Sequence, residues 1–111
     1  MVIRKAGERE AVGTSFTDHT IRASVNELKK VLGEPHYDDR DETEKSQVEW
    51  DFVIEGEGSV FTIYDWKEYR LYENDEIIEW HIGGFVSSFG DGHTDIALVI
   101  KELKALGLAV M

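Results

Sequence analysis

Residues 60–84 decide the fold: they contain VFTIYDWK at positions 60–67, a polar link, and IIEWHIGG at positions 77–84. Side chains on both faces of the first run are apolar or aromatic, which is typical of a central strand. In the second run Ile78, Trp80 and Ile82 share one face, opposite Glu79 and His81. We therefore expect these runs to form the centre of an antiparallel sheet and to be the best place for a binding surface.

A third strand is indicated just before this region. Val48, Trp50, Phe52 and Ile54 alternate with more polar residues, which is the period of a half-buried strand. Residues 55–58 read EGEG and form a hairpin turn that leads into the run at position 60. Further upstream, residues 13–22 are rich in Thr, Phe and Ile, which favours a short strand or an extended lead-in.

Two helices are predicted. Ser24 and Glu27 form a capping box, an apolar stripe follows at Val25, Leu28, Val31 and Leu32, and Gly33 and Pro35 end the helix. A second stripe predicts a helix over residues 94–106, which Asp91 or Thr94 could cap and which Gly107 ends.

These elements predict one domain over residues 1–111, with residues 1–12 as a loose N-terminal extension. The predicted fold class is α+β, in two layers: an antiparallel sheet of three to five strands, with two helices on one face, in the order β-α-β-β-β-α. The other sheet face would then expose part of an apolar set, and such a patch often marks a partner or a homodimer contact. Its members would be Val53, Phe61, Ile63 or Ile77.

Composition limits the partners. The chain of 111 residues has a formal net charge of −11 and no Cys, and no apolar run approaches the ~20 residues that span a bilayer. Such a charge repels nucleic acid and anionic membranes, so we expect neither as a direct partner, and we expect a cytoplasmic protein. The acidic residues are either an ordinary solvated surface or a face that imitates DNA phosphates for a basic protein groove.

The motifs for catalysis are weak. His81 could act as a base oriented by Asp65, but Ser87 and Ser88 lack a nucleophile elbow, so a structural His is favoured. The other histidines and the acidic run at positions 38–44 lack metal-ligand spacing. We therefore predict a non-enzymatic protein with no catalytic residues, no metal site and no cofactor.

A binding site can be assembled from the same central stretch. Trp66 and Trp80 offer stacking faces, and Lys67, Arg70 and His81 could hold an anion. Gly83 and Gly84 would allow a ligand to approach the backbone, as in a nucleotide-like pocket. The favoured alternative is that the three Trp residues are core aromatics and that the Gly pair is a turn.

Several short motifs carry a resemblance: GTS at 13–15, LGEP at 32–35, EW at 49–50, TIYDWK at 62–67 and WHIGG at 80–84. In this order they resemble a group of small proteins that recur in bacteriophage and prophage genomes. The lead-in departs from the group's pattern at Phe16-Thr17-Asp18-His19. The resemblance implies a phage accessory protein that interacts with host machinery.

Two functional hypotheses follow. The first is a non-enzymatic, acidic phage-type protein that binds a host protein, and that could inhibit a defence or nucleic-acid-handling system. The second is a module that binds or sequesters a small nucleotide-like ligand through Trp66, Lys67, Arg70, Trp80 and His81.

Overall fold

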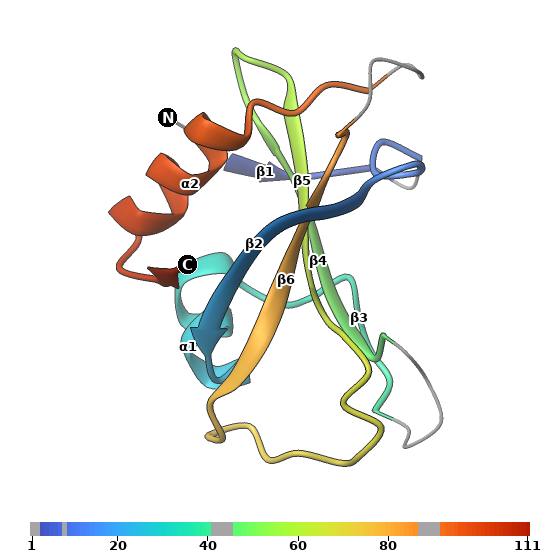
Figure 1. The fold of residues 1–111 in the computed structure, drawn as a ribbon, viewed down its shortest axis with the longest axis vertical. Helices are drawn as coiled ribbons and strands as arrows, with labels where there is room; N and C mark the ends of the chain where they lie inside the picture. Colours follow the sequence, from blue (N-terminus) through green and yellow to red (C-terminus); the bar gives the residue numbers. More distant parts are fainter. Residues whose placement is uncertain (1–2, 8, 41–45, 87–91) are drawn as a thin grey trace.

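The computed structural model describes residues 3–7, 9–40, 46–86 and 92–111, and within them the chain forms seven strands and two helices (Figure 1). In chain order these are β1 (Ile3–Lys5), β2 (Ser15–Ala23), α1 (Val25–Leu32), β3 (Tyr37–Asp38), β4 (Val48–Ile54), β5 (Ser59–Asp65), β6 (Ile78–Gly84), α2 (Ile96–Ala105) and β7 (Ala109–Val110). Neither described helix is long and apolar enough to cross a membrane.

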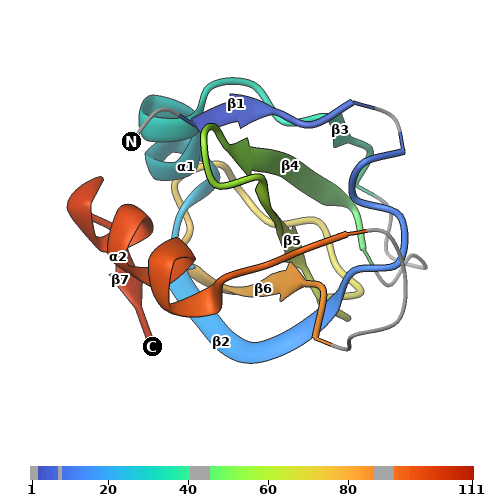
Figure 2. The same ribbon diagram turned by 90° about the horizontal axis from the view of Figure 1, so that it is seen from above.

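All strands pair antiparallel in a single sheet. Its order is β1-β4-β5-β6-β2-β7, and the two-residue β3 also pairs with β4, beyond the end of β1. The sheet curls into a half-barrel, and the two helices lie together on one side of the curve (Figure 2).

The predicted two-layer fold, with three to five strands and two helices on one sheet face, is therefore wrong. The strands β1, β3 and β7 are only two or three residues long, too short to show a period in the sequence. Strand twist adds up across the seven strands, so the sheet bends round its core instead of lying flat under a helical layer. Residues 3–5, within the predicted N-terminal extension, form β1.

The core fills the inside of the curve. Trp50 and Trp80 are fully buried, and their rings meet edge to face with centroids 5.5 Å apart. Both helices contribute apolar side chains to the same cluster, through Val25, Leu28, Val99 and Leu103.

The residues of β5 that we expected on the exposed sheet face are instead the ones that face the core. Phe61 and Ile63 point into the core, opposite Phe52 and Trp50 respectively across the β4–β5 ladder. Val53 is also buried, in a small second cluster with Ala6 and Val60. The apolar patch that we predicted for the second sheet face is therefore not formed, and of its four members only Ile77 is exposed.

Helix ends follow local chemistry. The Ser24 capping box is present in both directions, and Gly33 has a φ of 83° at the end of α1. At α2 the capping residue is Asp95, whose side chain accepts from the Leu98 amide. The two predicted caps differ: Asp91 lies outside the described residues, and Thr94 instead accepts from the Phe85 amide and donates to the Val60 carbonyl.

Candidate binding site on the outer face of the sheet

The outer face is the sheet face turned away from the core, and two rows of side chains cross it. The strand registers place neighbours side by side in each row. The first row is Thr20, His81, Tyr64, Glu49 and Tyr37, and the second row is Phe16, Gly83, Thr62 and Asp51. Five strands therefore supply one continuous surface.

His81 lies at the centre of an aromatic stack. The Phe16 ring lies on it with centroids 3.9 Å apart and planes 18° apart, and Trp66 stacks at 5.8 Å and 25°. Tyr64 meets the imidazole edge to face at 5.5 Å. Burial among these rings lowers the pKa of His81, while the nearby Glu79 partly opposes this effect. The imidazole is therefore neutral at pH 7.

A bulge in β2 brings Phe16 into this stack. The β2–β6 register shifts between Phe16 and His19, and Asp18 takes a left-handed backbone with φ of 68°. Bulges of this kind redirect a neighbouring side chain.

Gly83 is required by its neighbours across the sheet. A Cβ there would lie 2.2 Å from Thr62 Oγ1 and 3.1 Å from Tyr64 Cε1. A Cβ on Gly84 would lie 2.7 Å from Thr94 Cγ2. Both glycines lie within β6, so they are not the turn that we favoured, and the space beside them is filled by this protein's own side chains.

These side chains surround a cavity of about 460 Å³, which we name the aromatic slot. Its walls include Phe16, Glu49, Thr62, Tyr64, Trp66 and His81. Trp66 is 41% exposed and Phe16 is 37% exposed, so both rings combine a packed side with a solvent side. Its size and aromatic walls suit a side chain or another small group.

Glu49 lines the slot, and the Asp51 carboxyl lies beside it on β4, opposite Thr62 but outside the slot's walls. Burial, a hydrogen bond to Asp51 and repulsion from the Asp51 charge together raise the pKa of Glu49 to about 8. Tyr37 donates its hydroxyl to Glu49 Oε1 at 3.2 Å, and burial raises the pKa of Tyr37 to about 12. Asp51 Oδ1 is buried and has no hydrogen-bond partner among the described residues. Glu49 is therefore mostly protonated at pH 7.

Glu49 makes the stability of the fold depend on pH. Between the ordinary pKa of 4.5 and the folded value of about 8, the folded state holds a proton that the unfolded chain has lost. The free energy of unfolding therefore falls as pH rises through this window. Since Glu49 is partly solvated and screening reduces the effect, we expect a loss of about 2 kcal/mol.

The replacement Glu49→Gln should flatten this slope, because an amide cannot lose the proton. Urea unfolding at a series of pH values between about 5 and 8 measures it. Glu57→Gln, in the exposed β4–β5 turn, removes a carboxyl of the same kind and should keep the wild-type slope. Equal slopes for the wild type and Glu49→Gln would contradict the assignment.

The predicted binding residues divide into two groups. Trp66 and His81 line the aromatic slot, and Gly83 lies next to its wall residues Thr62 and Tyr64. The Lys67 ammonium lies 5.5 Å from the centroid of the Trp66 ring. Gly84 packs against Thr94, away from the slot.

The other two residues are elsewhere. Arg70 forms ion pairs with Glu68 and Glu76. Trp80 is in the core, where its Nε1 donates to the Ala23 carbonyl at 3.0 Å. The set of residues that we predicted for an anion is therefore not assembled at one place.

Asp65 and His81 do not form a catalytic pair, because they lie on opposite faces. Asp65 is fully buried on the core side, where Oδ1 accepts from the amides of Gln47 and Val48 at 2.6 and 3.0 Å. Its Oδ2 accepts from the Tyr72 hydroxyl at 2.8 Å. Ser87 and Ser88 lie outside the described residues, and the described part of the chain contains no cluster of His, Asp and Glu that could hold a metal ion.

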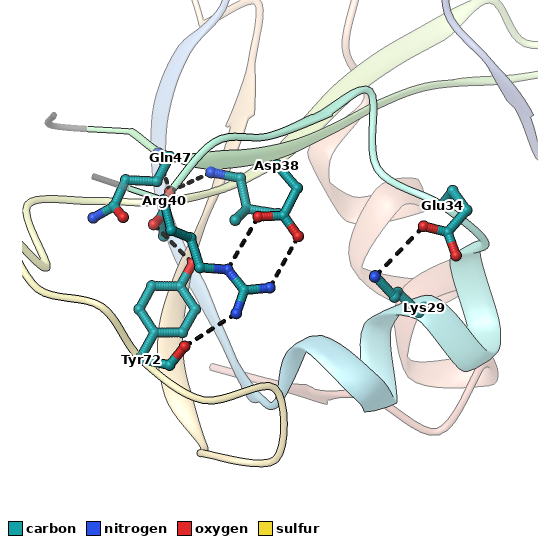
Figure 3. A network of polar contacts seen from close by, with 8 residues as sticks. Lys29, Glu34, Asp38, Arg40, Gln47 and Tyr72 are labelled. Atoms are coloured by element: carbon teal, nitrogen blue, oxygen red, sulfur yellow. Dashed lines mark hydrogen bonds and ion pairs between the residues drawn. The ribbon is translucent and has the colours of Figure 1, made fainter. Parts of the chain in front are cut away.

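Sequence reasoning missed the slot residues Phe16, Glu49 and Tyr64, because only the strand register brings them together. It also missed an arginine clamp in the acidic segment after β3. Arg40 binds both carboxylate oxygens of Asp38 and donates to the Tyr72 carbonyl at 3.0 Å (Figure 3). The clamp attaches β3 to the loop before β6, so the described part of this segment is more than a solvated loop.

His36 is a second unpredicted link. Its Nδ1 accepts from the Asp51 amide at 3.1 Å, and its Nε2 lies 3.1 Å from the Ala6 carbonyl. With Nδ1 accepting, Nε2 carries the proton and donates. The imidazole therefore bridges β4 and the segment after β1.

Comparison with known proteins gives no relative for this arrangement: no protein-family model, curated protein or solved structure matches the chain.

Proposed function

We propose that this chain is a non-enzymatic, acidic binding protein that recognises a basic surface of another protein through the outer face of its sheet. The observation that carries the proposal is the pair of half-exposed rings, Trp66 and Phe16, that flank His81 at the mouth of the aromatic slot. Aromatic side chains held rigidly beside a pocket are typical centres of protein interfaces.

Charge supports a basic partner. The formal net charge is −11, and Glu79, Glu49 and Asp51 lie on the same face as the aromatic stack. A partner with clustered Lys and Arg would be attracted from a distance and oriented toward this face. Nucleic acid and anionic membranes would be repelled by the same field.

The resemblance to small phage proteins supports the class of partner. We propose a host protein, met in the cytoplasm of the infected cell, with a basic groove of the kind that handles nucleic acid or takes part in defence. The absence of a hydrogen-bonded orienting group at His81 favours binding over catalysis, because Nδ1 is buried and unpartnered among the described residues.

The test is capture of partners from host lysate by the immobilised protein at low and at high salt. The wild type should retain a basic protein at low salt and lose it at high salt, because screening weakens the attraction. Trp66→Ala should lose the same protein at low salt, since it removes the exposed anchor.

Leu71→Ala is the matched control, because Leu71 is exposed but does not line the aromatic slot. It should retain the partner as the wild type does. If Trp66→Ala and Leu71→Ala retain the partner equally, with both variants folded, the outer face is not the interface.

A nucleotide-like ligand is the second candidate, and the position of Lys67 near the Trp66 ring favours it. Three features oppose it: Arg70 is paired with acidic side chains, Trp80 is in the core, and the acidic residues Glu79 and Asp51 on this face would repel a phosphate. We expect a panel of nucleotides to leave the Tm unchanged, whereas a saturable rise would favour this candidate.

A further inference from the structure

We propose that the aromatic slot receives an arginine side chain of the partner protein. The inference rests on the proposed function and names the group that the slot would recognise. The slot has aromatic walls, and neither Glu49 in its wall nor the neighbouring Asp51 forms an ion pair with a described Lys or Arg.

The walls suit a planar cation. A guanidinium stacks on aromatic faces and is attracted by their electron density. Trp66 and Tyr64 meet edge to face with centroids 6.1 Å apart, so the slot presents ring surfaces in two orientations. The Lys67 ammonium, 5.5 Å from the Trp66 centroid, is an example of a cation held by this ring.

The carboxyl groups suit the donors of the same cation. Glu49 and Asp51 project from alternate positions of β4 onto the outer face, and no Lys or Arg within the described ranges forms an ion pair with either. Asp51 Oδ1 is a buried acceptor without a donor. A guanidinium has five N–H donors in a fixed plane and can satisfy two such oxygens at once.

Of the other charges around the slot, the Glu79 carboxylate favours a cation, whereas the Lys67 ammonium opposes one. Glu79 adds a carboxylate beside His81, although it is paired across the ladder with Arg22, and Lys67 is the basic group at the Trp66 ring. His81 is neutral and adds no opposing charge. A phosphate would meet Glu49 and Asp51, and an apolar group would bury them without a donor, which costs free energy.

Lysine is a weaker fit than arginine. Its ammonium is compact and strongly hydrated, so it gains less from stacking and must lose more water on entering the slot. An arginine at the end of a basic segment would be steered by the overall charge of −11 and then anchored between the rings.

The experiment uses N-acetyl-arginine amide as the probe and N-acetyl-citrulline amide as its control, because citrulline keeps the planar shape but has no charge. Binding is followed by NMR of the Trp66 indole and the His81 ring in the full-length chain. Arginine should shift both signals saturably, lysine amide should bind several-fold more weakly, and citrulline should leave them unchanged.

A matched pair of variants tests the carboxyl groups. Glu49→Gln/Asp51→Asn keeps the shape of the slot and should weaken arginine binding about tenfold. Glu55→Gln/Glu57→Gln removes two carboxyls from the exposed β4–β5 turn and should change the affinity less than twofold, since exposed charges act weakly.

Equal NMR shifts from the arginine and citrulline probes, or no shift with the arginine probe, would overturn the inference. Both measurements use the wild-type protein, so they do not depend on whether a variant folds. If lysate capture still depends on Trp66 in that case, the binding face stands and only the arginine assignment fails. If arginine fills the slot but Trp66→Ala captures the partner normally, the interface proposal fails instead.

Discussion

The variant Asp65→Ala is expected to lose about 3–5 kcal/mol of stability, which is a large part of the 5–15 kcal/mol typical of a domain. Asp65 is fully buried, and its oxygens accept from two backbone amides and one hydroxyl. Alanine would leave all three donors buried and unpaired, and each such group costs about 1–3 kcal/mol. The amides belong to Gln47 and Val48, so the start of β4 would lose its attachment to β5.

Urea unfolding followed by circular dichroism measures this loss. Tyr72→Phe is the graded control, because it removes only the hydroxyl that donates to Oδ2 and should cost about 1 kcal/mol. Asp65→Asn keeps acceptor capacity for the amides and should fall between the two. If Asp65→Ala unfolds at the same urea concentration as Tyr72→Phe, the carboxylate does not hold the start of β4.

The second large effect is expected at Gly83. Gly83→Ala should destabilise the fold by about 1–3 kcal/mol, because the new methyl group would overlap the Thr62 side chain and press on Tyr64. Since both neighbours line the aromatic slot, the same change should also weaken capture of the partner. Thermal unfolding measures the first effect, and the lysate experiment measures the second.

The double variant Thr62→Ala/Gly83→Ala tests whether steric overlap with the Thr62 side chain causes the loss of stability. Removing Oγ1 from position 62 opens the space that the methyl group needs, so the double variant should be less destabilised than the sum of the single variants. The coupling free energy should be about 1 kcal/mol or more. Additive single effects would show that Gly83 is required for another reason.

The sequence predicted β6 better than β5, and the difference has a physical cause. In β6 the apolar residues Ile78, Trp80 and Ile82 alternate with Glu79 and His81, so the buried face was clear. In β5 both faces are largely apolar, so alternation did not show which row faces the core, and the row of Phe61, Ile63 and Asp65 is the buried one. A carboxylate is buried there because backbone amides satisfy it, and alternation cannot anticipate such a partner.

The aromatic slot could be predicted only in part. Trp66 and His81 were identified, because aromatic residues and a His in a central strand pair suggest a surface. Phe16 reaches the site through the bulge at Asp18, and Glu49 reaches it through the β4–β5 register. Both depend on how distant segments align, and no local pattern of residues encodes that alignment.

The strand order also implies a sequence of events during folding. The strands β4, β5 and β6 follow one another along the chain and pair in that order, whereas β2 pairs with β6 although α1, β3, β4 and β5 lie between them in sequence. Closing that long loop is slow compared with forming the local hairpin. We expect β4 and β5 to assemble first and β2 to dock later, so Phe16 would complete the aromatic slot only at the end of folding.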